Sequence, residues 1–192
     1  MKIFRVKPDV EGFRHFLPVD ESGLAAFAGL DGTPRSDTWS PPRVAVVHAE
    51  RPAGNFFGFG GGFLITDEKA TDALYTLFEM AGEMLPLPHG GESYTVLNVT
   101  QCIDCLDHDR TTWSTSRKGE RLRIEHYEFS KFHLSETPIF KIPEEDRTAI
   151  YVVEGITDPD EEFREIAERE GLQGVIFEEV WSCADGDDTM EE

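Results

Sequence analysis

The chain has 192 residues, 39% of them hydrophobic and 11% aromatic, a composition that supports one globular domain with a substantial core. It carries 38 acidic and 18 basic side chains, a formal net charge of −20. Such a field repels nucleic acid and anionic membranes, so neither is expected as a partner, and it speeds encounter with a basic protein. The absence of a membrane-length apolar run or a signal peptide predicts a cytoplasmic protein.

The negative charge is concentrated near the carboxyl terminus. Residues 142–192 hold 18 acidic and 3 basic side chains, a net charge of −15, whereas residues 1–141 carry −5. From residue 184 onward the chain is acidic and poor in apolar side chains, which is typical of a solvated tail. We therefore predict one domain over residues 1–183, followed by an acidic tail at 184–192.

The first third of the chain alternates short apolar runs with turn residues. Residues 2–7 alternate apolar and basic side chains before a proline, which predicts a short edge strand. One turn of helix is expected near residues 24–28, and a strand at 44–47 after two prolines. The glycine-rich stretch at 55–62 precedes another strand, at 63–65, and lacks Gly-Lys-Ser/Thr. This context favours a mobile aromatic loop over a phosphate-binding loop.

Two segments have the pattern of amphipathic helices. Thr66 or Asp67 is positioned to cap a helix over about 67–82, whose apolar stripe contains Ala70, Leu74, Leu77, Phe78 and Ala81. Asp158 and Pro159 are expected to begin a second helix that runs to about 170. Further strands are predicted at 122–129, 139–142, 150–153 and 175–181. Together these elements predict an α+β fold, with a mixed, largely antiparallel sheet and the helices at about 67–82 and 159–170 packed on it.

The segment over residues 94–109 is the one around which the chain is organised. It begins with β-branched and aromatic residues, typical of a central strand, and ends in a dense cluster of polar and sulfur side chains. Cys102, Cys105 and His108 have metal-ligand types at suggestive spacing. A structural zinc site needs four ligands, and Cys183 has no nearby cysteine partner, so two ordinary thiols are favoured. A metal-binding enzyme or sensor that uses Cys102, Cys105 and His108, with Asp107, remains the alternative.

The aspartates of this segment could have either a chemical or a structural role. Asp104, Asp107 and Asp109 could form an acid/base pair or a cation site. Such residues more often cap turns by accepting backbone hydrogen bonds, and the sequence lacks the calcium-loop glycine and glutamate. Neither His-Glu-x-x-His nor Gly-x-Ser-x-Gly occurs in the sequence. We therefore predict no catalytic residues and no cofactor.

Short motifs along nearly the whole chain resemble a bacterial immunity-protein family, first catalogued as a domain of unknown function and later assigned to polymorphic toxin systems. In order, these are Asp37-x-Trp39 with Pro41-Pro42, Phe63-x-Ile65-Thr66 leading to Ala70 and Ala73-Leu74, Gly82-Glu83-x-Leu85-Pro86-Leu87, Asn98-Val99-Thr100, Asp104-Cys105-Leu106-Asp107, Ile139-Phe140-Lys141-Ile142-Pro143, and Gly171-Leu172-x-Gly174-x-x-Phe177 with Trp181. The glycine-rich stretch after Asn55 and the acidic tail depart from the family pattern.

The resemblance implies a compact, non-enzymatic α+β protein, made in the cytoplasm beside a toxin gene, that binds and blocks the cognate toxin domain. The charge suggests that acidic side chains occlude the toxin's active site in place of an anionic substrate. The candidate toxin-binding residues are Glu161, Glu162, Glu178 and Glu179, with Asp107 and Asp109 as lesser contributors. A cytoplasmic scaffold or regulatory domain is the remaining alternative. The oligomeric state and the toxin's identity are left open.

Overall fold

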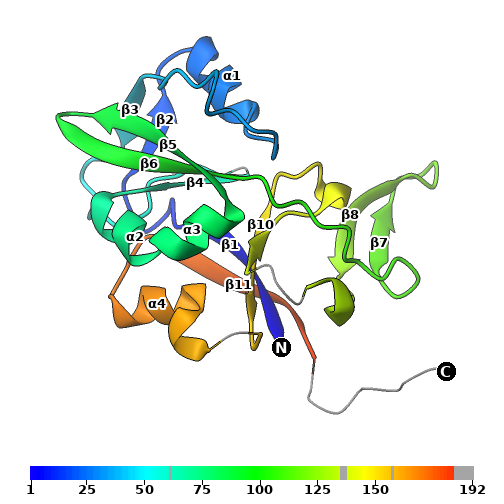
Figure 1. Cartoon of the computed structure of the whole chain (residues 1–192). Helices are drawn as coiled ribbons and strands as arrows, with labels where there is room; N and C mark the ends of the chain where they lie inside the picture. Colours follow the sequence, from blue (N-terminus) through cyan, green and yellow to red (C-terminus); the bar gives the residue numbers. More distant parts are fainter. Residues whose placement is uncertain (61, 135–137, 157, 184–192) are drawn as a thin grey trace.

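The computed structural model describes residues 1–60, 62–134, 138–156 and 158–183, and the predicted acidic tail lies outside them. The fold is α+β, as predicted (Figure 1). The strands are β1 (Lys2–Pro8), β2 (His15–Pro18), β3 (Val44–Val47), β4 (Phe63–Thr66), β5 (Gly82–His89), β6 (Glu92–Val99), β7 (Thr112–Thr115), β8 (Arg121–His126), β9 (Ile139–Phe140), β10 (Ile150–Glu154) and β11 (Val175–Ser182). The helices are α1 (Glu21–Ala28), α2 (Glu68–Ala73), α3 (Tyr75–Ala81) and α4 (Phe163–Arg169), with 3-10 turns η1 (Lys131–His133), η2 (Pro143–Glu145) and η3 (Pro159–Glu161).

An antiparallel sheet in the order β11-β1-β10-β9 joins the two ends of the described chain. The prediction that residues 2–7 form an edge strand was wrong, because β1 lies between β10 and β11. Its apolar residues are buried, whereas Lys2 and Lys7, near its two ends, reach solvent. Arg5 enters a polar network, so the alternating basic residues do not require an edge.

A second antiparallel sheet has the order β4-β6-β5. The strand that begins the organising segment is central in this sheet, as predicted. Strand β5 was missed, because Pro86 and Pro88 suggested a break in regular structure. Proline is tolerated at a sheet edge, and here both prolines are exposed while Leu85 and Leu87 are buried. The β2–β3 pair and the β7–β8 hairpin complete the strands of the described residues.

The helix predicted at 67–82 is divided into α2 and α3 at Leu74, which has φ −105° and ψ 9°. Asp67 caps α2, since its side chain accepts a hydrogen bond from the Ala70 N–H at 2.9 Å. Gly82 begins β5 directly after α3. A Cβ at that position would lie 2.1 Å from the Asn98 carbonyl oxygen, so the close approach to β6 requires glycine. The second predicted helix begins as η3, and its α-helical part is α4.

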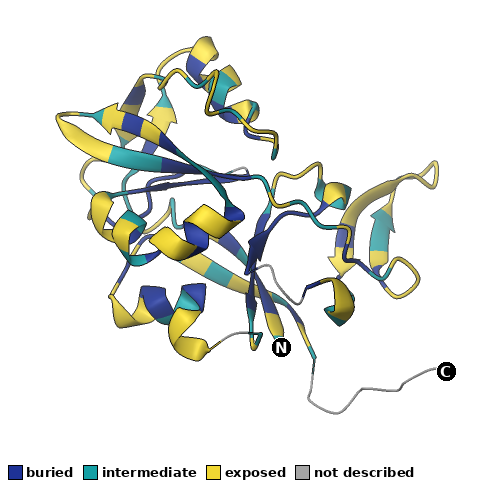
Figure 2. Cartoon of the chain, in the orientation of Figure 1, coloured by how far each residue is buried: buried dark blue, intermediate teal, exposed yellow. Residues whose placement is uncertain are grey.

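The buried apolar residues form three cores between these elements. Figure 2 shows that buried residues line the inward faces of both the helices and the sheets. The first core joins α2, α3 and α4 to one face of each large sheet. The second lies between the opposite face of the four-stranded sheet and the β7–β8 region. The third lies between the three-stranded sheet and the β2, β3 and α1 region. Phe56 and Phe57 are buried, so the predicted aromatic loop is anchored in these cores.

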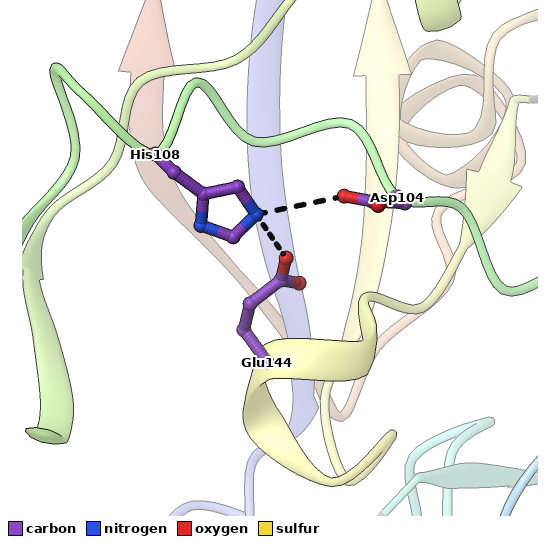
Figure 3. A group of neighbouring side chains, drawn as sticks. All are labelled: Asp104, His108 and Glu144. Atoms are coloured by element: carbon purple, nitrogen blue, oxygen red, sulfur yellow. Dashed lines mark ion pairs between the residues drawn. The ribbon is translucent and has the colours of Figure 1, made fainter.

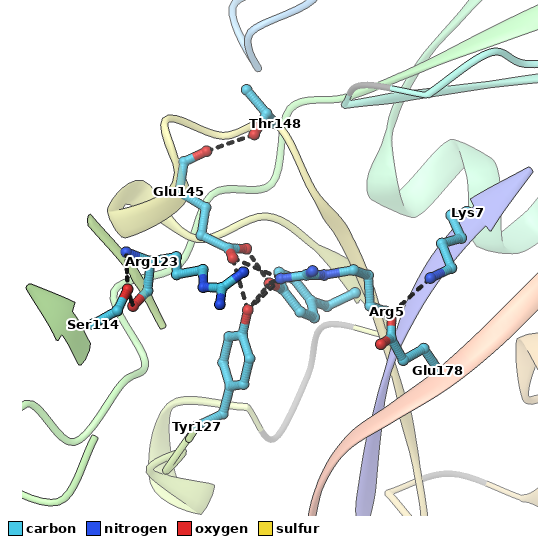
Figure 4. Close-up of polar contacts among 9 residues, drawn as sticks. Arg5, Lys7, Ser114, Arg123, Tyr127, Glu145, Thr148 and Glu178 are labelled. Carbon is cyan, nitrogen blue, oxygen red and sulfur yellow. Dashed lines mark hydrogen bonds and ion pairs between the residues drawn. The ribbon is translucent and has the colours of Figure 1, made fainter. Parts of the chain in front are cut away.

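A polar network crosses the boundary of the second core (Figure 4). Arg5 donates from Nη2 to Glu145 at 2.6 Å, to Tyr151 at 3.0 Å and to Tyr127. Glu145 also accepts hydrogen bonds from Tyr127, at 2.7 Å, and from Tyr151. Burial, with the nearby Glu145 carboxylate, raises the pKa of Tyr151. One carboxylate thus ties η2 to β1, β10 and the segment after β8.

We expect Glu145→Gln to lower the free energy of unfolding by about 2 kcal/mol, because hydrogen bonds to a charged group contribute about 1.5–3 kcal/mol. The amide keeps the shape but presents an N–H group toward donors from Arg5 and the tyrosines. Glu125→Gln on the exposed face of β8 is the matched control, expected within about 0.5 kcal/mol of the parent. Urea unfolding of the three proteins measures both changes. Equal midpoints for Glu145→Gln and the parent would contradict the role given to the network.

Candidate functional site: an apolar groove on an acidic helical face

A groove of about 430 Å³ lies where α3 and α4 approach each other. Leu74, Leu77 and Ile166 form its floor and belong to the first core. Met80 lines the groove with 49% of its surface exposed, which is unusual for a large apolar side chain. The remaining lining residues are Ala73, Thr76, Pro138, Asp160 and Glu161. The groove is therefore apolar at its centre and carries two carboxylates at its border.

The helical face around the groove is strongly acidic. Residues 67–81 and 158–170, which contain α2, α3, η3 and α4, hold eleven acidic and three basic side chains, a net charge of −8. The outward surfaces of these helices are exposed in Figure 2, while their inner surfaces are buried. An apolar centre surrounded by like charge is the arrangement expected of a surface that receives a partner of the opposite charge.

The two arginines of this face are already paired with carboxylates. Arg164 contacts Glu154 at 3.2 Å and Glu168 at 2.9 Å. Arg169 contacts Asp160 at 3.6 Å and Glu170 at 3.5 Å. Among the residues that the structure describes, Glu161 is exposed and forms no ion pair. No basic side chain among the described residues therefore neutralises its carboxylate beside the groove.

The two glutamates predicted in the second helix have different environments. Glu161, at the end of η3, lines the groove. Glu162, next to it, is buried, and its carboxylate accepts a hydrogen bond from the Gly155 N–H at 2.6 Å. Glu162 therefore holds the turn after β10, and its charge is not presented at the surface.

Glu178 and Glu179 lie on β11, on the four-stranded sheet. Each forms an ion pair at 2.9 Å with a lysine of β1, Glu178 with Lys7 and Glu179 with Lys2. These hydrogen bonds lower the pKa of both carboxyls. The pairs are exposed, so they contribute little to stability, but they neutralise part of the charge that the sequence assigned to this strand.

The turn that follows β6 uses Asp107 as a structural cap. The Asp107 Oδ1 accepts backbone hydrogen bonds from Asp109 at 3.0 Å and from Arg110 at 3.2 Å. The backbone-capping reading of Asp107 is confirmed, whereas Asp109 is exposed. Both residues lie on the loop before β7, not on the helical face.

The alternative metal set, Cys102, Cys105 and His108, is not brought together as three ligands. Cys105 is fully buried in the second core, and burial raises the pKa of its thiol to about 12, which disfavours the thiolate that binds metal. Burial also raises the pKa of the half-buried Cys102. His108 instead faces Asp104 and Glu144 (Figure 3).

Comparison with known proteins gave no match: neither a protein-family model nor a curated protein sequence aligns with this chain. None of the helices that the structure describes is both long and apolar enough to cross a membrane.

Sequence reasoning identified the acidity of residues 142–192, which include η3 and α4, but it missed the groove. Leu74 and Leu77 were assigned to the buried stripe of the first helix. Met80, near the end of that helix, was left out. An apolar side chain beside, rather than within, an amphipathic stripe is the signal that could have indicated an exposed apolar site.

Proposed function

We propose that this protein is a non-enzymatic immunity protein that binds a cognate bacterial toxin domain in the cytoplasm and occludes its active site. The observation that carries the proposal is the apolar groove between α3 and α4, which lies among helical segments with a net charge of −8. The resemblance of the chain's motifs to immunity proteins of polymorphic toxin systems supports the same function independently.

The partner surface has the complementary chemistry: at least one protruding apolar side chain surrounded by lysine and arginine. Toxins that act on nucleic acids or dinucleotides have basic substrate sites, so an acidic protein can cover such a site in place of the substrate. The apolar centre provides most of the affinity, because buried anchors dominate binding energies. The carboxylates accelerate association and orient the partner. No cofactor is required for this inhibition.

The proposal is tested by a pull-down of this protein against the product of the neighbouring upstream gene, combined with co-expression of the two. Tight binding together with suppression of that product's toxicity is the expected result. A toxic product that neither binds this protein nor is neutralised by it would overturn the proposal. Binding without any toxicity would instead favour the scaffold or regulatory alternative.

A further inference from the structure

Three potential metal ligands converge from two separate segments (Figure 3). Asp104 and His108 come from the loop after β6, and Glu144 comes from η2. The His108 Nε2 lies 3.2 Å from the Glu144 Oε1 and 3.7 Å from the Asp104 Oδ1. All three ligand atoms lie within 4.8 Å of one another.

These separations are close to those between neighbouring ligands of a small divalent ion. Nitrogen and oxygen ligands lie about 2.0–2.2 Å from Zn²⁺, so neighbouring ligands in a tetrahedral site are about 3.3–3.6 Å apart. The separation from His108 to Glu144 lies just below that range, and the separation from His108 to Asp104 lies just above it. The Asp104 side chain is 76% exposed, and it can therefore rotate the short distance that closes the sphere.

Glu144 provides a second, independent indication of a ligand. Its side chain is only 10% exposed, and its Oε2 is buried without a hydrogen-bond partner among the described residues. A buried carboxylate oxygen is costly unless it is hydrogen-bonded or coordinated. The ion pair with His108 involves only the Glu144 Oε1, so the Glu144 Oε2 has no hydrogen-bond partner among the described residues. A cation bound beside Glu144 interacts with the whole carboxylate and accounts for its burial.

The backbone holds the two segments together before any ion binds. The Lys141 N–H donates to the Gln101 carbonyl, and the Ile103 N–H donates to the Lys141 carbonyl, each at 2.9 Å. Farther along the loop, the Asp107 N–H donates to the Glu128 carbonyl at 2.9 Å. Asp104 and His108 are thus fixed on a loop that is anchored at both ends, as a preorganised metal site requires.

We propose that Asp104, His108 and Glu144 bind one divalent transition-metal ion, for which Zn²⁺ is the probe. An imidazole with two carboxylates suits Zn²⁺, Mn²⁺ or Fe²⁺, whereas sites for Mg²⁺ consist of oxygen ligands and water. Three protein ligands leave at least one position for water, because Asp104 and His108 are open to solvent. This site is independent of the proposed toxin-binding groove.

The test is calorimetric titration of chelator-treated full-length protein with Zn²⁺, with Mg²⁺ as the comparison ion. One equivalent of Zn²⁺ is expected to bind, and His108→Ala and Asp104→Asn are each expected to weaken binding at least tenfold. Asp104→Asn changes an exposed side chain, so its effect is separable from misfolding. The matched control is His126→Ala. His126 is an exposed histidine at the end of β8, and it also lies near a carboxylate, that of Glu128. It is expected to retain the parent affinity.

Two outcomes of the titration would overturn this site. One is the absence of stoichiometric Zn²⁺ binding, and the other is binding that survives both His108→Ala and Asp104→Asn. Substitution with Co²⁺ identifies the ligands directly, because thiolate ligands produce a charge-transfer band that nitrogen and oxygen ligands lack. A Co²⁺ spectrum with that band, lost in Cys102→Ser, would transfer the metal to the cysteines and contradict the proposal.

Discussion

Replacing Met80 and Glu161 together by arginine is expected to weaken binding of the cognate partner about 100-fold, or about 2.7 kcal/mol. Met80 lies at the exposed part of the groove, and Glu161 carries the carboxylate at its border that has no ion-pair partner among the described residues. The substitutions remove an apolar anchor and place two positive charges opposite a basic surface. Surface plasmon resonance at two salt concentrations measures both the affinity and its electrostatic part.

The matched control carries the same two chemical changes on a different face. Leu122 is 65% exposed on β8 and Glu125 is exposed on the same strand, so Leu122→Arg with Glu125→Arg alters the net charge equally. This control is expected to bind within a few-fold of the parent. Equal losses in both double variants would show that net charge, rather than the groove, determines affinity. An unaffected groove variant would exclude the helical face as the binding surface.

A third variant tests the prediction for β11. Lysine at both Glu178 and Glu179 breaks the ion pairs with Lys7 and Lys2 and creates like-charge contacts on the four-stranded sheet. Binding that falls as far as in the groove variant would extend the interface to this strand. The groove variant and the β11 variant together therefore show which of these two surfaces the partner contacts.

Lys141→Met is expected to change how stability depends on pH. The Lys141 side chain is fully buried, and its ammonium donates to the Leu30 carbonyl at 3.0 Å. Burial lowers the pKa of this lysine from 10.5 to about 8, despite the attraction of Asp31. Below pH 8, the folded protein must therefore either bury the charged Lys141 ammonium or release the proton of this lysine.

The sign follows from proton binding. Between pH 8 and 10.5 the unfolded chain holds more protons on Lys141 than the folded chain, so the contribution of this residue to stability rises with pH. Relative to Lys141→Met, the parent is expected to gain about 2 kcal/mol in free energy of unfolding between pH 7 and pH 10. Urea unfolding of both proteins across this range measures the difference.

Comparison with the variant separates Lys141 from other groups that titrate at high pH. Burial raises the pKa values of Cys105 and Tyr127 to about 12, and these groups reduce stability as the pH rises above their ordinary values. Both proteins contain them, so their effects cancel. A difference that does not change with pH would show that Lys141 keeps its ordinary pKa.

The environment of Lys141 also gives a reason for one glycine of the aromatic loop. A Cβ at Gly62 would lie 2.9 Å from the Lys141 Nζ and 2.5 Å from the Arg147 carbonyl oxygen. The buried lysine therefore occupies the space beneath the loop. The glycine-rich composition here serves close packing, which agrees with the sequence-based rejection of a phosphate loop.

Elements whose signals lie within a few residues were predicted well. The Asp67 cap and the strand at Val44–Val47 follow from local chemistry. Strand β5 was missed because its prolines are acceptable only at a sheet edge, which is a tertiary property. The prediction that β1 lies at a sheet edge was wrong for the same reason. Alternating basic residues do not specify how many strands pair with the strand that carries them.

The same division applies to the candidate site. The sequence predicted that the last third of the chain is acidic, and among its candidate residues it included Glu161. It had no means of separating Glu161 from Glu162, because adjacent glutamates differ only in whether the fold provides a partner such as the Gly155 N–H. Likewise Glu144, which completes the ligand set of His108, lies 36 positions away in the chain.

The sequence by itself determined the fold class, the acidity and most of the local elements, since these depend on composition and on neighbours within one or two helical turns. The tertiary structure alone decided which charges are paired, which apolar residues stay exposed and which ligands meet. Lys7 and Glu178, for example, are 171 positions apart and yet in contact. Burial and ion pairing act through space, and distant segments meet only when the chain has folded.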